Sequence, residues 1–282
     1  MRRRPMGRTC PVAAGPPRTA NQGMEAVSEI DVNGERLGYD RAGAGEPLLL
    51  IHSLGTAAWL WQEQIRRWSP HFDVIAVDAR GHGRSSRNGG FTVRNVATDL
   101  AAVLAAFGGK PAKVVAISMG GPIAAHLTDI APHLVKSLVI ADSFATQGEA
   151  GATRAAAIEK TIRDGSIDDY ARRYATETLV EDGDPAHVEA LVASIAAMSA
   201  DAYIEAAQSV FTSDVVELFK RVTVPTRVVV GSRDQRTPPS LSEAIVGLIP
   251  GAEFAVIDGA RHLANLDRPE GFHAAVDPFL LG

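Results

Sequence analysis

The sequence predicts an α/β fold with a mostly parallel central sheet, helices on both faces, and an inserted all-helical cap. Short apolar runs alternate with segments of helical spacing along most of the chain. One long alanine-rich stretch, residues 144–221, contains only helical spacing. The 282 residues, of which 46% are hydrophobic and 22% charged, suffice for one large domain with an insertion.

The first predicted strands form a hairpin, because Asn33-Gly34 is a turn signal between two alternating segments. The run at 47–51 is uninterruptedly apolar, as expected for a strand buried on both faces. In chain order, we expect strands at 27–32, 36–41, 47–51, 74–77, 113–117, 137–140, 226–230 and 253–257. Helical spacing predicts helices at about 56–68 and 92–107, from shortly after Ser118 to about 130, and at about 269–280.

Residues 1–23 are rich in Arg, Pro and Gly and are expected to be a disordered N-terminal extension. They carry five arginines and no acid, but they lack the apolar segment that a twin-arginine export signal needs. Met24 is an alternative start of the chain. We place the core at 24–143 and 222–282, with the cap at 144–221.

Charge and cysteine content exclude several classes of function. The net charge is −5, and the body is more acidic still because of the basic tail, which argues against nucleic acid as a partner. No apolar run approaches the roughly 18 residues of a membrane span. Cys10 is the single cysteine, so no intrachain disulfide can form, and no His/Asp/Glu cluster has metal-ligand spacing. We expect a cytoplasmic protein with a small-molecule substrate and no metal; the oligomeric state stays open.

Ser118 is the predicted nucleophile. It follows the apolar run at 113–117 and precedes Gly120-Gly121 and a helical pattern, which is typical of a sharp strand-to-helix turn that exposes a serine hydroxyl. Ala116 stands where the commoner pattern has glycine. One methyl there is expected to change local packing more than function.

A serine nucleophile needs a base and an orienting acid. Asp234 and His262 each follow a predicted strand, in the chain order Ser, Asp, His that is expected when a triad lies across the ends of parallel strands. Asp142, directly after the strand at 137–140, is the rival acid or a pocket residue. We therefore predict Ser118, Asp234 and His262 as the catalytic residues.

The oxyanion of an acyl-transfer reaction needs two N–H donors. We predict the backbone of Met119, which follows the nucleophile, and of Leu54, in the loop after the strand at 47–51. Possible pocket residues are Ser53, Trp59 and Asp142. We interpret His52 and the glycine-rich loop at 78–85 as structural.

These motifs together resemble the α/β-hydrolase superfamily. They are His52-Ser53-Leu54-Gly55, Asp78-x-Arg80-Gly81-His82-Gly83-x-Ser85, the Ser118 elbow, Asp234 and His262. The resemblance implies a serine hydrolase with a helical cap, without metal or organic cofactor. Within the superfamily the chain is similar to 3-oxoadipate enol-lactonases, in Ser118-Met119-Gly120-Gly121, Asp234-x-x-Thr237-Pro238-Pro239 and His262-Leu263-Ala264-Asn265. That likeness implies hydrolysis of a lactone or small carboxylic ester in aromatic catabolism.

Other functions remain open at this stage. The same motifs occur in general esterases, cofactor-free perhydrolases and hydrolases of carbon–carbon bonds in ring-cleavage diketones, and a ligand receptor can use the same fold. An enol-lactonase must also hold a substrate carboxylate. The cap offers Arg154, Lys160, Arg163, Arg172 and Arg173, and each of them alone is expected to be a solvated surface residue.

Overall fold

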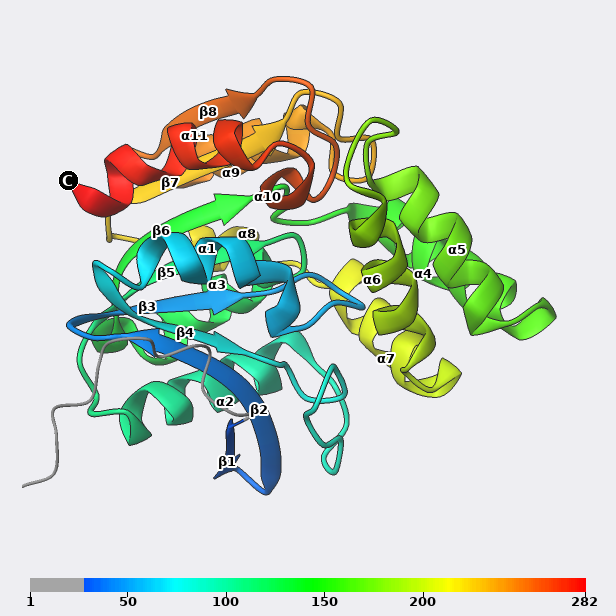
Figure 1. Ribbon diagram of the computed structural model, residues 1–282, viewed down its shortest axis with the longest axis horizontal. Helices are drawn as coiled ribbons and strands as arrows, with labels where there is room; N and C mark the ends of the chain where they lie inside the picture. Colours follow the sequence, from blue (N-terminus) through cyan, green and yellow to red (C-terminus); the bar gives the residue numbers. More distant parts are fainter. Residues whose placement is uncertain (1–27) are drawn as a thin grey trace, which may run out of the picture.

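A computed structural model describes residues 28–282 of the chain. Its central element is an eight-stranded sheet with the strand order β1-β2-β4-β3-β5-β6-β7-β8 (Figure 1). The strands are β1 (Ser28–Val32), β2 (Glu35–Gly43), β3 (Glu46–Ile51), β4 (Phe72–Val77), β5 (Ala112–Ile117), β6 (Val135–Ala141), β7 (Thr226–Gly231) and β8 (Glu253–Ile257). Within this sheet β1–β2 and β2–β4 are antiparallel pairs and the other five pairs are parallel, which confirms the predicted mostly parallel arrangement.

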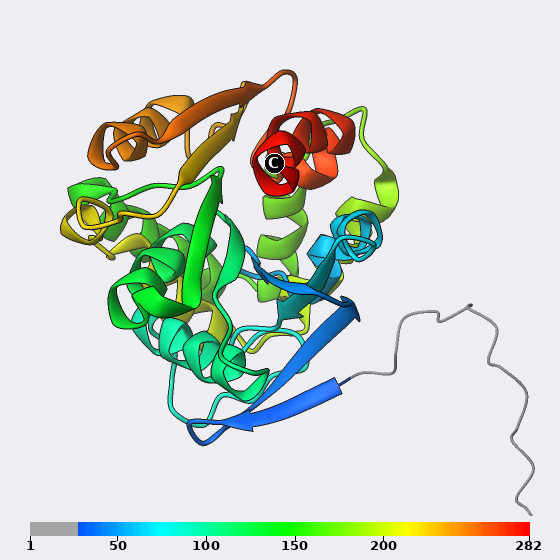
Figure 2. The same ribbon diagram turned by 90° about the vertical axis from the view of Figure 1, so that its left-hand side faces the viewer.

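Helices cover both faces of the sheet, as Figure 2 shows from the side opposite the cap. One face carries α1 (Gln62–Trp68), α10 (Ala264–Asp267) and α11 (Pro269–Leu281). The other carries α2 (Val93–Ala106), α3 (Gly120–Ile130), α8 (Val216–Phe219) and α9 (Pro239–Leu248). Because both faces are covered, the central strands are buried apart from residues near their amino ends; Leu48, Leu49 and Leu50 of β3 have no exposed surface.

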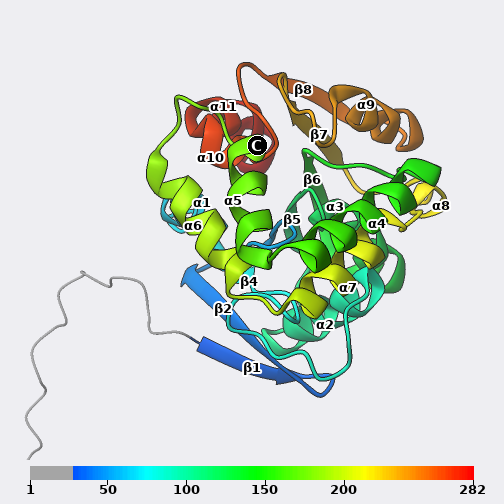
Figure 3. The ribbon, with the colours of Figure 1, turned by 90° about the vertical axis from the view of Figure 1, so that its right-hand side faces the viewer.

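The remaining long helices are α4 (Gly148–Asp164), α5 (Ile167–Thr178), α6 (Pro185–Ala196) and α7 (Ala200–Phe211). They lie beyond the carboxyl ends of the parallel strands (Figures 1 and 3). An isolated bridge between Thr146 and Asp214 joins the two ends of this insertion. Ligands of open α/β sheets bind at this edge, so these helices cover the expected position of a site. The division into a core and a cap domain at 144–221 stays a prediction.

Some predicted elements differ from the structure. The segment expected to be one helix at 56–68 is a 3-10 turn, η1 (Ala58–Trp61), followed by α1. The helices α9 and α10 and the 3-10 turn η2 (Pro132–Leu134) were not predicted. The predicted disorder of residues 1–23, and the tail's Cys10, lie outside the described residues.

In the described part of the chain, no single helix is long and apolar enough to cross a membrane. The pair α6 and α7 passes a test of length and composition when taken together, but the two helices meet at an angle of 102°.

Candidate active site

Ser118 lies on the sharp turn between β5 and α3. Its φ is +55°, in the left-handed region of backbone conformation that residues other than glycine rarely adopt. The side chain thereby leaves the strand direction. Two hydrogen bonds fix this turn: the Ser118 N–H donates to the Ala141 carbonyl (2.8 Å), and the Ser143 hydroxyl donates to the Ser118 carbonyl (2.6 Å). The side chain is nearly buried, with 7% of the residue exposed.

The predicted triad residues come together at the carboxyl end of the sheet. Ser118 Oγ lies 2.8 Å from His262 Nε2, and His262 Nδ1 lies 2.9 Å from Asp234 Oδ2. A carboxylate can only accept, so Nδ1 carries the proton and Nε2 is free to accept from the serine hydroxyl. The geometry is that of a nucleophile, a base and an acid that orients the base.

Thr237 is a further member of this network, to which the sequence analysis assigned no role. Its hydroxyl lies 2.7 Å from Asp234 Oδ2 and 3.1 Å from His262 Nδ1, and the Thr237 N–H donates to Asp234 Oδ1 (2.9 Å). The sequence offered one clue, the position of Thr237 three residues after the acid in the same loop. Burial alone would raise the pKa of Asp234, but the nearby His262 and the hydrogen bonds from His262 and Thr237 bring it below its usual value.

Asp142 occupies a different position from the triad acid. It is fully buried, and its carboxylate accepts from the N–H groups of Gly231 (2.8 Å) and Ala264 (3.1 Å). It therefore ties together the two loops that carry Asp234 and His262. Burial, and repulsion from Asp234, raise the pKa of Asp142 well above its usual value. Asp142 has no exposed surface in this structure, and its assignment as a possible pocket residue stays a prediction.

The predicted oxyanion donors are two backbone N–H groups that lie on different loops. Met119 follows the nucleophile, and Leu54 lies in the loop after β3. Neither backbone N–H donates to another residue within the range 28–282. That leaves both N–H groups available to a ligand oxygen, as an oxyanion site requires.

The loop of Leu54 is held in place by His52. The Ala79 N–H donates to His52 Nε2 (2.9 Å), so the proton of this buried imidazole is on Nδ1, 2.7 Å from the Ser53 carbonyl. Asp78 at the start of the neighbouring loop accepts from the Ala58 N–H (2.7 Å) and from Arg84. These contacts agree with a structural role for His52 and the loop at 78–85.

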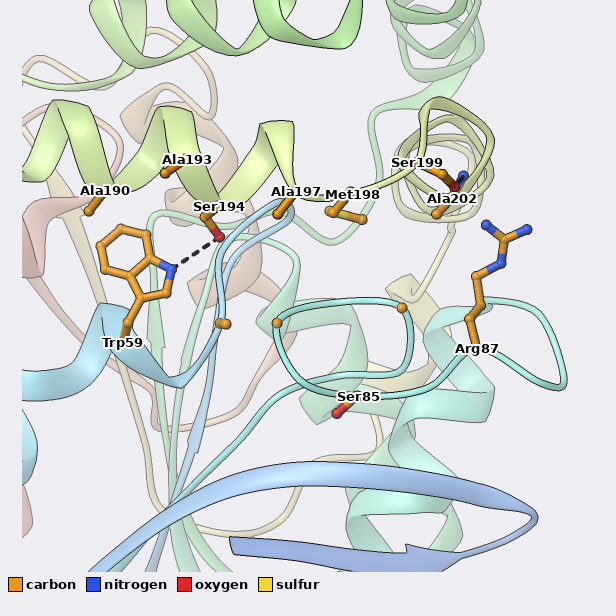
Figure 4. A pocket seen from close by; sticks show the side chains of 13 residues that line it. Trp59, Ser85, Arg87, Ala190, Ala193, Ser194, Ala197, Met198, Ser199 and Ala202 are labelled. Carbon is orange, nitrogen blue, oxygen red and sulfur yellow. Dashed lines mark hydrogen bonds between the residues drawn. The ribbon is translucent and has the colours of Figure 1, made fainter. Parts of the chain in front are cut away.

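A cavity of about 860 Å³ lies between α6 and the loops that follow β3 and β4 (Figure 4). Trp59, a predicted pocket residue, lines it and donates from its indole N–H to the Ser194 hydroxyl of α6 (3.1 Å). Ser53 and Ser118 are not among its lining residues, and Ser53 is fully buried. Ile195 and Tyr203 of the cap pack closely against Gly55 in the loop after β3.

Three residues offer an unexpected group of possible metal ligands in the described chain. Ligand atoms of Glu63, Glu270 and His273, on α1 and α11, lie within 4.8 Å of one another. However, His273 Nε2 lies 3.2 Å from the Gln64 amide nitrogen, a donor, which places the imidazole proton on Nδ1, the atom that would have to bind the metal. We assign no metal to this group, and the predicted absence of a metal stays a prediction.

Comparison with known proteins agrees with this architecture. The family model described as "alpha/beta hydrolase fold" matches residues 46–269. A 3-oxoadipate enol-lactonase of Acinetobacter baylyi is 30% identical over 235 residues, which cover 82% of this chain and 86% of that protein.

Solved structures are similar over nearly the whole described chain. A hydrolase from Pseudomonas aeruginosa superposes with a TM-score of 0.82 at 27% identity, covering 91% of this chain and 98% of that one. The enol-lactonase from Burkholderia xenovorans superposes with a TM-score of 0.83 at 23% identity, covering 90% of this chain and 100% of that one. The second likeness, at this low identity, concerns the fold alone.

Proposed function

Because this chain belongs to the α/β-hydrolase family and is an ester-bond hydrolase, we propose that Ser118, His262 and Asp234 are its catalytic triad. The observation that carries the proposal is the continuous chain of contacts from Ser118 Oγ to His262 (2.8 Å) and on to Asp234 (2.9 Å). The left-handed backbone at Ser118 supports it, because strain of this kind is retained where function needs it.

In the first half of the proposed reaction, His262 Nε2 takes the proton of the Ser118 hydroxyl while Oγ attacks the substrate carbonyl. The carbonyl oxygen becomes an oxyanion, which accepts hydrogen bonds from the N–H groups of Leu54 and Met119. Asp234 stabilises the imidazolium that forms. The alcohol then leaves with the proton from His262, and an acyl-enzyme ester on Ser118 remains.

Water completes the cycle. His262 takes a proton from water, the hydroxide oxygen attacks the acyl carbonyl, and collapse of the second oxyanion returns the proton to Ser118 Oγ. The carboxylic acid leaves, so each turnover consumes one water. For a lactone, acid and alcohol stay joined in one product.

The proposed substrate is a lactone or a small carboxylic ester. The supporting observation is the sequence likeness to the Acinetobacter enol-lactonase, which extends over 82% of this chain.

The nucleophile is tested with a serine-directed fluorophosphonate. We expect covalent labelling of Ser118 in the folded protein, located by peptide mass, and no labelling of Ser118→Ala. Labelling that is absent from the folded wild type, or unchanged in the variant, would contradict the proposal.

The substrate class is tested by comparing turnover of an enol-lactone, a simple aryl ester and a ring-cleavage diketone. We expect the lactone or the ester to have the highest kcat/KM. A preference for the diketone would instead indicate a carbon–carbon bond hydrolase working with the same triad.

A further inference from the structure

The cap helix α5 ends against the loop that carries His262. The last carbonyl groups of an α-helix have no partner within the helix, and a cation near this end is favourable. The last turn of α5, residues 175–178, contains no Lys or Arg of its own. Arg261, the residue before His262, supplies the cation: its Nη1 donates to the carbonyls of Leu179 (2.8 Å) and Thr176 (3.3 Å).

The backbone of His262 takes part in the same junction. Its N–H donates to the carbonyl of Thr178, the last residue of α5 (3.3 Å). The hydroxyl of Thr178, which is fully buried, accepts from Arg236 Nε in the loop of Asp234 (2.6 Å). The end of one cap helix therefore contacts both the loop of the proposed base and the loop of the proposed acid.

Asp267, the last residue of α10, joins the two sides of this junction. Its carboxylate accepts from the N–H of Val180, just after α5 (3.0 Å), and from the N–H of Arg261, just before the base (2.8 Å). Burying a carboxylate is costly, and burial raises the pKa of Asp267 even though both N–H groups favour its ionised form. The fold thus retains a costly group whose hydrogen bonds connect the cap to the neighbour of His262.

The imidazole of His262 reaches its two partners only if its backbone is fixed. Nε2 lies 2.8 Å from Ser118 Oγ and Nδ1 lies 2.9 Å from Asp234 Oδ2, so a displacement of the loop disturbs at least one of these contacts. A shift of about 1 Å in a reacting group can lower a rate by on the order of 10²-fold. The cap contacts of residues 261 and 262 are therefore well placed to control the geometry of the base.

We propose that Asp267 is a positioning residue for the base: it holds the loop of His262 against the end of α5, so that catalysis depends on the position of the cap. Arg261 assists through its side-chain contacts with the same helix end. A movement of α5 away from the sheet would break these contacts and misplace His262. This inference rests on the proposed function, since it assumes that His262 is the base.

The test compares two acetate esters that differ in their leaving groups. The nitrophenolate of 4-nitrophenyl acetate leaves without a proton, whereas the alcohol of butyl acetate must take one from His262. In Asp267→Asn an amide N–H faces a backbone donor, which displaces the loop. We expect kcat/KM for butyl acetate to fall by roughly 10- to 100-fold, and that for the nitrophenyl ester by less than about fivefold. A variant that is merely less stable would lose both activities by the same factor.

A second variant covers the case in which Asp267→Asn folds poorly. Arg261→Ala removes the contacts with Leu179 and Thr176 but leaves no buried charge without a partner. It should show the same dependence on the leaving group, with kcat/KM for butyl acetate reduced by roughly 3- to 10-fold more than that for the nitrophenyl ester.

The matched control is Glu35→Gln. Glu35, at the start of β2, is also buried, and its carboxylate accepts from the N–H groups of Asn88 (2.9 Å) and Gly89 (2.7 Å). Its loss should lower the unfolding temperature but leave the ratio of the two kcat/KM values unchanged.

Equal losses on both esters, or no loss on either, in folded Asp267→Asn would overturn the inference. If that variant does not fold, the same result in Arg261→Ala overturns it. Fluorophosphonate labelling of Ser118 in the wild type, which needs neither variant, separates this outcome from a failure of the proposed function.

Discussion

Two non-glycine residues of the site region have left-handed backbones, Ser118 (φ +55°) and Asp142 (φ +46°). Each comes directly after a parallel strand, where the chain must turn sharply. Such conformations cost on the order of 1–3 kcal/mol each and persist only when surrounding contacts fix them. At Ser118 the turn directs the hydroxyl to His262, and at Asp142 it directs the carboxylate to two backbone N–H groups.

The two buried carboxylates are distinguished by paired variants. In Asp234→Asn, we expect kcat on an ester to fall by about 10⁴-fold, because the amide favours the wrong imidazole tautomer, while the thermal unfolding transition stays cooperative. In Asp142→Asn, one amide N–H would face a backbone donor, so the loss should be in stability, roughly 1–3 kcal/mol, with kcat changed by less than about tenfold. If Asp142→Asn lost more turnover than Asp234→Asn, the acid of the triad would be Asp142.

At the scale of elements, the sequence was most informative for strands. The strand predicted at 253–257 has those bounds, and the others differ by a few residues at their ends. The apolar runs of the central strands β3, β4, β5, β6 and β7 reflect burial on both faces, a strong local pattern. The helix α9 was not predicted, although proline is favourable at the first position of a helix and Pro239 begins this one.

The candidate site was predictable only where its residues follow strands, because strand patterns are local and helix packing is not. Ser118, Asp234 and His262 occupy the ends of parallel strands, and the topology alone brings such ends to one edge. The contacts of Asp267 depend instead on how the end of α5 packs on the loop of His262, which no local pattern encodes. For the same reason, sequence reasoning could not distinguish the half-buried Arg154 from the four exposed cations of the cap.

The elbow between β5 and α3 permits a test of close packing. A Cβ added to Gly120 would lie 2.7 Å from the Ile51 carbonyl oxygen and 3.2 Å from Ala116 Cβ, the methyl that replaces the commoner glycine. Gly120→Ala should therefore lower the free energy of unfolding by roughly 1–3 kcal/mol and reduce turnover by displacing Ser118. Urea denaturation and ester hydrolysis measure the two effects.

The matched control is Gly247→Ala on α9, where an added Cβ meets nothing within 4 Å. Alanine in this helix should raise the free energy of unfolding by roughly 0.5–1 kcal/mol and leave turnover unchanged. Equal effects of the two substitutions would contradict the steric account of the elbow.

On the scale of the whole molecule, contacts between distant loops hold the carboxyl edge of the sheet together, and two buried histidines lie at their centre. The rings of His52 and His82 are 5.2 Å apart, and both residues are 1% exposed. Burial lowers the pKa of both, and repulsion between the two rings contributes at His82, where the pKa falls to about 3. The His82 imidazole is therefore neutral in the folded protein over most of the acidic range.

This burial should make the global stability depend on pH. A free histidine titrates near 6.5, so between that pH and about 3 the unfolded chain binds a proton at His82 that the folded chain does not. The unfolded state is then favoured as the pH falls, and His82 contributes a loss of up to about 1.4 kcal/mol per pH unit across this window. Replacing His82 by Phe, which keeps a ring against Phe91, should remove that part of the slope. Urea denaturation between pH 4.5 and 7 measures the slope, with His133→Phe, at an exposed position, as the control. Parallel slopes in all three proteins would mean that His82 takes up no proton on unfolding, and that the acid sensitivity of this fold arises elsewhere.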